Sequence, residues 1–475
     1  MLKGAATLAA GRAGAAALRF ARNVLLARLL PVEEYGLAST FVVLMAFVDM
    51  ASDLALERLV VQDREGDQPR VVAAIQTLAL LRGVLLAGVT ILAAGPMADL
   101  FGHPELAPAF ALFAAVPFLR GIAHLDMMRE QREMRFGRVT RADLAGVGVS
   151  LVALWPCALV LGDHRIMLVL LLLEHATRSA VSIAFAERPF ALGWDGAVVR
   201  RALGFGGPLL LSGLLAFATL QGDRVIVANQ LGAETLGLFS AALTFAMTPC
   251  LLAGSIANAV FLPMLARAQD DNAVFARRSR LTLEAMMVAG AGTMFAFAVI
   301  GPWAFEGVFG RAYAEAAPLV VLLGAVFSLR LVRAGPTTAA MARGHNSNLL
   351  LANLARLVSL GPALAAVMSG YGVETLALFA LAGEALALLV SLRLLHRIDL
   401  RRKDIGVGAW VVLAVLTAML VLSAPTPWAS AVPGWALQAP AAAGLICLLA
   451  VCRDLRGSVR RMVGQRLNLG RGRGR

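Results

Sequence analysis

Arginines inside apolar segments are the residues of this chain best suited to chemistry. In the segment 5–30, Arg12, Arg19 and Arg22 fall within about an 80° arc of a helix. A guanidinium group stays charged and forms bidentate hydrogen bonds to carboxylate or phosphate oxygens. Ionisable side chains are rare in membrane-spanning segments and face the protein interior or a wet cavity. This arrangement indicates non-covalent binding of an anion, and we expect Arg19 and Arg22, near mid-depth, to bind substrate.

Carboxylates follow a regular spacing in the next apolar segment, 37–59. They recur every four positions, at Asp49, Asp53 and Glu57. Residues four apart lie on one face of a helix, so the three carboxylates form an acidic stripe. We expect them, together with Arg12, to serve first as structural or coupling counter-charges.

The segments 5–30 and 37–59 should form an antiparallel hairpin, in which residues equally far from the turn share a depth. The predicted ion pairs are Arg12 with Asp53, and Arg19 or Arg22 with Asp49. The hairpin would then be held together by its own charges.

Later apolar segments carry a second set of ionisable residues, at Asp223, Arg224, Arg330, Arg333, Arg356 and Glu384. We interpret Glu384 as a counter-charge. Arg333 and Arg356 suit a structural or a substrate role equally well, and Arg330 has no assigned role. A further group, Glu174, His175 and Arg178, has helical spacing and is expected to satisfy itself locally.

Other kinds of chemistry find little support in the sequence. The six histidines and four cysteines are scattered without metal-ligand spacing. A phosphate-binding loop of the GK[ST] type is absent. We therefore expect no catalytic residue, no metal and no cofactor, and we do not expect an enzyme.

The composition places the chain in a membrane. Of its 475 residues, 59% are hydrophobic and 15% charged, whereas soluble domains carry roughly 25% charged residues. Backbone polar groups in a bilayer must be satisfied within the segment, which favours helices. The net charge is +13, and almost all of the positively charged residues are arginines, which lie in the connections between the apolar segments. It therefore indicates membrane topology, and nucleic acid is not an expected partner.

About fourteen segments are long enough to span the roughly 30 Å hydrocarbon core. They are 5–30, 37–59, 71–94, 104–124, 142–161, 165–186, 204–229, 236–262, 281–303, 316–337, 347–368, 373–394, 406–423 and 434–452. Arginines gather in every second connection, whereas the opposite connections hold only Arg165 and Arg311. Cytoplasmic connections are enriched in Lys and Arg. This alternation predicts that both termini are cytoplasmic.

An internal repeat relates two parts of the chain. The segments 22–39 and 223–240 align without gaps, and their matched positions include Gly36 with Gly237 and Ser39 with Ser240. The offset of 201 residues spans six predicted helices, an even number that preserves orientation. The halves should therefore be parallel repeats related by an axis along the membrane normal.

These observations predict an all-α integral membrane protein. Two six-helix bundles in parallel repeat, 1–190 and 191–400, should surround a central cavity. Two additional helices should follow in 401–453, and a basic cytoplasmic tail without a packed core in 454–475.

Several motifs resemble a known family. Residues 25–37, LLARLLPVEEYGL, resemble the opening hairpin of polysaccharide-biosynthesis or oligosaccharide flippases. The stretches 223–225, DRV, and 231–242, LGAETLGLFSAA, resemble the same hairpin in the second half. The stretches 261–263, FLP, and 310–313, GRAY, are similar to that family too. The resemblance covers roughly residues 5–400.

The resemblance implies a fold shared with multidrug extruders and lipid II flippases, working by alternating access. It implies a bacterial inner-membrane location and a polyprenyl-diphosphate-linked oligosaccharide as the substrate, used in surface polysaccharide synthesis. Membrane lipid, a polysaccharide polymerase and glycosyltransferases are the other candidate partners. By rough position, the resemblance places a charged substrate cavity at Arg19, Arg22, Arg224, Arg333 and Arg356.

Two rival functions remain open on the sequence alone. A cation-coupled multidrug exporter of the same superfamily would need a cavity dominated by acids, and the arginine excess disfavours it. A membrane polysaccharide polymerase or ligase would need a sizeable outer loop for its catalytic groups, and the predicted outer loops are short. The number of buried charges also disfavours a passive membrane scaffold.

Overall fold

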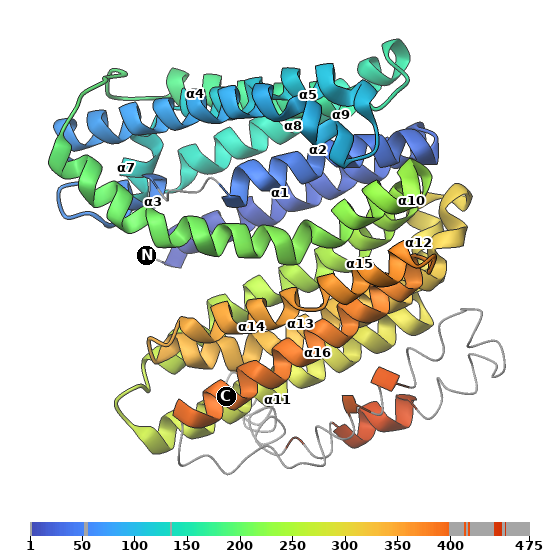
Figure 1. The fold of residues 1–475 in the computed structure, drawn as a ribbon. Coiled ribbons are helices and arrows are strands. Elements are labelled where there is room, and N and C mark those ends of the chain that lie inside the picture. Colours follow the sequence, from blue (N-terminus) through green and yellow to red (C-terminus); the bar gives the residue numbers. More distant parts are fainter. Residues whose placement is uncertain are drawn as a thin grey trace, which may run out of the picture. The chain divides into compact units, whose positions relative to one another are not determined.

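A computed structural model describes residues 2–51, 56–133 and 135–398, together with 413–414, 417–418, 441–448 and 452. In these residues helices are the only regular secondary structure (Figure 1). This confirms the all-α prediction. Asp53 and the tail 454–475 lie outside the described residues, as does most of the two predicted C-terminal spans.

The chain divides into two compact units, residues 1–241 and 242–475. The helices of the first unit are α1 (Leu2–Leu29), α2 (Val32–Ala51), α3 (Leu56–Gln62), α4 (Pro69–Leu100), η1 (Pro104–Leu106), α5 (Ala107–Phe113), α6 (Ala115–Gly121), α7 (Asp126–Arg132), α8 (Gly137–Val160) and α9 (Arg165–Ala184). They end in the continuous run α10 (Gly196–Ala266), which continues into the second unit.

The second unit contains the rest of α10 and the helices after it. These are α11 (Asn272–Val299), α12 (Gly301–Phe309), η2 (Arg311–Ala316), α13 (Ala317–Ala342), α14 (Ser347–Leu357), α15 (Leu360–Met368) and α16 (Val373–Ile398). The boundary between the units falls after Ala241 and not after residue 190. The predicted division into bundles 1–190 and 191–400 stays a prediction.

Helix α10 contains the turn that the sequence places between two spans. Gly232 interrupts the helix with φ 82° and ψ 174°, a conformation that favours glycine because a Cβ would be strained there. The run 196–266 is therefore two helices joined at a glycine, as the predicted spans 204–229 and 236–262 require.

The described residues include eight helices long and apolar enough to cross a membrane. The number becomes nine if the pair Pro104–Gly121 and Asp126–Arg132, bent by 50°, is one broken span. Every predicted span from 71–94 to 373–394 falls on one of them, and 210–266 holds two. The protein is a multi-pass membrane protein, and the total of fourteen spans stays a prediction.

In the first unit the helices do not simply follow chain order. Helix α1 packs chiefly against α8 and makes few contacts with α2, and α8 packs against α9. Helix α4 packs against α5 and α6 (Figure 1). In the second unit α13 packs between α11 and α16, and most of its residues are buried.

The matched glycines of the repeat touch each other's segments in the first unit. A Cβ on Gly36 would overlap the carbonyl oxygen of Ala233, and a Cβ on Gly237 would overlap that of Val32. Val32 and Ala233 are themselves 201 positions apart, so the two contacts are reciprocal. Glycine is required at both positions because the backbones approach too closely for a side chain.

The matched serines meet one turn further along. Ser240 Oγ donates a hydrogen bond to Ser39 Oγ at 3.0 Å, which joins equivalent positions of the two segments. Reciprocal contacts between equivalent residues are what a two-fold relation produces. The residues that reveal the repeat in the sequence are thus those that pack the two segments together.

Candidate substrate site

The arginines of α1 converge on a carboxylate of α9. Arg19 Nη2 lies 2.8 Å from Glu174 Oε1, and Arg22 Nη1 lies 2.5 Å from Glu174 Oε2. Arg22 Nη1 also donates to Ser150 Oγ of α8 at 3.0 Å. Arg22 and Glu174 are buried, whereas the Arg19 side chain is 44% exposed. Arg19 is thus the member of this group that faces open space.

These contacts correct the pairing expected for the first hairpin. Asp49 pairs with Arg120 of α6, not with Arg19 or Arg22. The physical reason is that α1 packs on α8 far more than on α2, its neighbour in sequence, and that its arginines reach Glu174 of α9. The expectation that Glu174 is satisfied within its own helix was wrong for the same reason.

A second carboxylate gathers arginines in the second unit. Glu384 of α16 is fully buried and forms ion pairs with three guanidinium groups, accepting hydrogen bonds from those of Arg330 and Arg333. Arg330 Nη2 lies 3.1 Å from Oε2, Arg333 Nε 2.8 Å from Oε1, and Arg356 Nε 3.7 Å from Oε2. Arg356 also donates to Ser359 Oγ at 2.6 Å. Glu384 therefore acts as a counter-charge to arginines of two helices, α13 and α14.

Arg224 of α10 belongs to the first unit and forms a hydrogen bond with a glutamine of its own helix. It is buried, and its Nη1 donates to Gln221 Oε1 at 3.0 Å. Among the five arginines proposed from the sequence to bind substrate, the structure brings Arg19 together with Arg22, and Arg333 with Arg356. A single cavity lined by all five stays a prediction.

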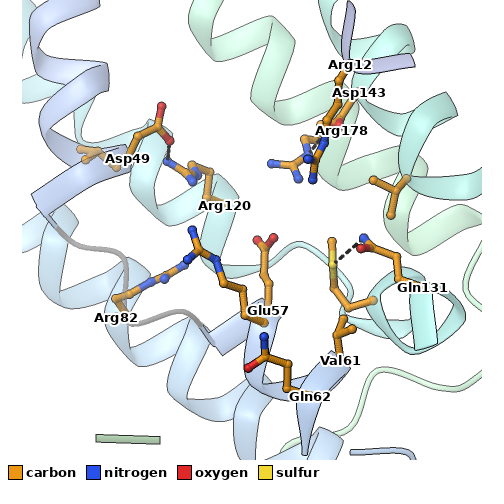
Figure 2. Close-up of a pocket in the computed structure, with 14 residues that line it drawn as sticks. Arg12, Asp49, Glu57, Val61, Gln62, Arg82, Arg120, Gln131, Asp143 and Arg178 are labelled. Atoms are coloured by element: carbon orange, nitrogen blue, oxygen red, sulfur yellow. Dashed lines mark hydrogen bonds and ion pairs between the residues drawn. The ribbon is translucent and has the colours of Figure 1, made fainter. Parts of the chain in front are cut away.

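The first unit contains a polar cavity of about 430 Å³ (Figure 2). Its charged lining residues are Arg12, Asp49, Glu57, Arg58, Arg82, Arg120, Asp143 and Arg178. Among the lining residues that the structure describes, five arginines face three carboxylates, an excess of two positive charges. The cavity is within the size range of small-molecule sites, roughly 300–1,000 Å³.

Two ion pairs position part of this lining. Arg120 bonds to Asp49, and Arg178 Nε lies 2.8 Å from Asp143 Oδ1, both drawn as dashed lines in Figure 2. Gln131 Nε2 donates to Met128 Sδ at 3.1 Å on the α7 side. The other charged residues of the described lining are Arg12, Glu57, Arg58 and Arg82.

Eight helices surround the cavity, α1 to α4 and α6 to α9. Sequence reasoning identified Arg12, Asp49 and Glu57 as counter-charges but missed Arg82, Arg120 and the other lining residues. Arg82 and Arg120 lie inside the predicted spans 71–94 and 104–124, and an ionisable residue inside a span is itself a signal of function. None of the five arginines proposed to bind substrate lines this cavity.

The connections at the predicted cytoplasmic end of the first unit form an ion-pair network. Glu187 pairs with Arg138 at 2.7 Å and with Arg129 at 3.0 Å, while Arg188 pairs with Asp67 at 3.1 Å. The hydrogen bond and charge of Arg138 lower the pKa of Glu187 below its ordinary value of 4.5. The Glu187 carboxylate is therefore ionised at neutral pH and paired with these arginines.

The arrangement is suited to binding an anion. Guanidinium groups in a low-dielectric interior bind phosphate or carboxylate oxygens strongly, because water competes less. Within the part of the chain that the structure describes, no group of His, Cys, Asp and Glu is placed to hold a metal ion.

Comparison with known sequences identifies a family. The profile of the family described as "Polysaccharide biosynthesis protein" matches residues 25–318. The chain is 23% identical over 327 residues to the lipopolysaccharide biosynthesis protein WzxC of Escherichia coli (strain K12), covering 66% of this chain and 64% of WzxC. It is 25% identical over 326 residues to the succinoglycan biosynthesis transport protein ExoT of Rhizobium meliloti (strain 1021), covering 66% and 63%. The match spans a little under two thirds of the length of these relatives.

Solved structures share the fold. An inward-facing multidrug resistance MATE transporter of the MOP superfamily aligns with a TM-score of 0.68 at 14% identity, covering 80% of this chain and 94% of the transporter. The lipid II flippase MurJ in an inward closed conformation aligns with a TM-score of 0.67 at 11% identity, covering 94% and 97%. At these identities the likeness establishes the fold.

Proposed function

We propose that this chain, which belongs to the polysaccharide biosynthesis protein family, moves a polyprenyl-diphosphate-linked oligosaccharide from the cytoplasmic to the outer leaflet of the bacterial inner membrane. The protein is a transporter, and its curated relatives are named for lipopolysaccharide biosynthesis and succinoglycan transport. The product would be used for surface or extracellular polysaccharide. A polysaccharide polymerase and glycosyltransferases would act beside it.

The observation that carries this proposal is the arginine excess of the cavity in the first unit. A diphosphate entering a low-dielectric interior loses its water and needs charged donors in return. Arginine supplies them with a planar fork that matches phosphate oxygens. A neutral lipid or a cationic drug would gain nothing from such a lining.

Transport of this kind requires no covalent step. The diphosphate and the sugars would pass through the protein while the polyprenyl tail stays in the bilayer. Alternating access would expose the binding site first to the cytoplasm and then to the outside. The chain's own groups need only replace the hydration of the diphosphate and release it again.

A cation-coupled multidrug exporter is the second candidate function. It is supported by the likeness to a MATE transporter and by the three carboxylates in the cavity, Asp49, Glu57 and Asp143. Two of these carboxylates are already paired with arginines. The net positive lining favours an anionic substrate over a cationic one.

The test is a flipping assay in proteoliposomes with a fluorescent polyprenyl-diphosphate oligosaccharide. We expect the wild type to flip it, and Arg12→Gln with Arg82→Gln to slow the initial rate by about tenfold or more, the change for one charge-assisted hydrogen bond. The matched control is Arg200→Gln with Arg277→Gln, which removes the same charge from exposed positions outside the cavity. Export of a cationic dye by vesicles that do not flip the oligosaccharide would favour the multidrug exporter instead.

A further inference from the structure

Glu174 forms ion pairs with two arginines of α1, Arg19 and Arg22, which lie close to the cavity. One of its oxygens bonds Arg19 and the other bonds Arg22, from a helix more than 150 positions away in sequence. The carboxylate therefore stands where an anionic group of a substrate would bind if these arginines had no partner.

The three side chains differ in how firmly they are held. The exposed fractions are 5% for Glu174, 4% for Arg22 and 44% for Arg19. Arg22 and Glu174 form an enclosed pair that Ser150 also contacts. The Arg19 guanidinium group is bonded to Glu174 but is partly exposed, so it can bind a second anion without disruption of the helix packing.

The ion pair of Arg19 and Glu174 lies one to two helical turns from the cavity lining, along α1 and along α9. Arg12 of the cavity lining precedes Arg19 by two helical turns of α1, about 10 Å. Arg178 of the lining follows Glu174 by one turn of α9. On both helices, the direction from the cavity lining to this ion pair points away from the predicted cytoplasmic side of the membrane. An anion that leaves the cavity toward the outside meets Arg19 next.

We propose that Glu174 is a resident anion, which the diphosphate of the substrate displaces from Arg19 during transport. This inference rests on the proposed function. The exchange keeps every charge compensated, because Glu174 retains Arg22 while Arg19 turns to the phosphate. A buried charge is never left without a partner, which would be costly in the membrane interior. Glu174 is thus a positioning residue that weakens binding and so permits release.

The first experiment measures binding of inorganic pyrophosphate to the purified full-length protein by isothermal titration calorimetry. Glu174→Gln should lower the Kd by about tenfold, since it removes a competing carboxylate. Arg19→Gln should raise the Kd by a similar factor. Glu234→Gln, the same substitution at an exposed turn, should leave the Kd unchanged.

The second experiment separates binding from turnover in the flipping assay. Glu174→Gln should lower the KM and also lower kcat, because the substrate binds more tightly and leaves more slowly. Glu174→Asp keeps the carboxylate and should restore kcat in part. A purely structural carboxylate would instead give a lower kcat with an unchanged or higher KM.

The outcomes distinguish the two proposals. If the wild type flips the oligosaccharide but folded Glu174→Gln has an unchanged or higher Kd, the resident-anion inference is overturned and the function stands. If Glu174→Gln does not fold, Arg19→Gln decides, and an unchanged Kd there overturns the inference. If no flipping occurs, the proposed function fails, whatever the Kd of these variants.

Discussion

At the scale of single residues, two buried glutamates organise the charged interior. Glu174 holds two arginines in the first unit and Glu384 holds three in the second. Each carboxylate is outnumbered by the guanidinium groups around it. A single carboxylate compensates only one of these positive charges, and our proposal is that Arg19 of the first unit can then bind an anionic ligand. In this protein the counter-charges therefore set how strongly the arginines can bind anything else.

Removal of the Glu384 carboxylate should destabilise the protein. Glu384→Gln leaves three arginines of α13 and α14 without their shared partner, and breaking a buried ion pair costs roughly 3–5 kcal/mol. The thermal unfolding midpoint in detergent should fall clearly. Glu374→Gln, at the start of the same helix and only partly buried, is the matched control and should change the midpoint little. Equal midpoints for the two variants would contradict a stabilising role for Glu384.

At the scale of helices, the repeated glycines and serines allow close backbone contact between α2 and the second part of α10. Gly36 and Gly237 remove the side chains that would separate the two helices, and Ser39 bonds to Ser240 one turn later. Packing of this kind depends on small residues, since lipid tails supply no hydrophobic force between helices. The same two positions therefore serve both halves of the chain.

Substitution of the crossing glycines should weaken this contact. Gly36→Ala places a Cβ on the carbonyl oxygen of Ala233 and should cost roughly 1–3 kcal/mol of stability, the usual range for overpacking. Gly148→Ala in α8 has open space around its Cβ and is the control. Since alanine favours helix more than glycine, the control should be neutral or stabilising. Thermal unfolding of both variants checks the prediction, and a neutral Gly36→Ala would refute the close contact.

At the scale of the whole molecule, arginine placement predicts the orientation in the membrane. The positive excess of the chain lies on alternate connections, and the short connections on the other side hold few arginines. Because arginine-rich connections are retained in the cytoplasm, the alternation predicts which loop faces which side.

Chemical labelling tests this orientation. In a variant in which the four native cysteines are serines, Tyr371→Cys should react with a membrane-impermeant maleimide in intact spheroplasts. Asp270→Cys should react only after lysis, since its connection is predicted to be cytoplasmic. Both positions are exposed, so access differs only by the side of the membrane. Labelling of Asp270→Cys in intact spheroplasts would reverse the predicted topology.

Features that depend on local composition could be predicted from the sequence. Apolar length predicts the spans, from 71–94 to 373–394, because a helix must match the bilayer and satisfy its own backbone. The repeat of Gly36 and Ser39 at Gly237 and Ser240 was visible because equivalent packing needs the same small residues. The family followed from the same hairpins.

Which charged side chains pair with each other depends on helix packing and could not be predicted from the sequence. The sequence paired Asp49 with Arg19 or Arg22, yet Asp49 bonds Arg120, and the α1 arginines bond Glu174. Helical periodicity predicts which face of a helix a residue occupies. It does not predict which other helix packs against that face. Because α1 packs on α8 and its arginines reach Glu174 of α9, their partners come from positions more than 120 residues away. For the same reason no local sequence pattern predicts the cavity, because its lining residues come from eight helices.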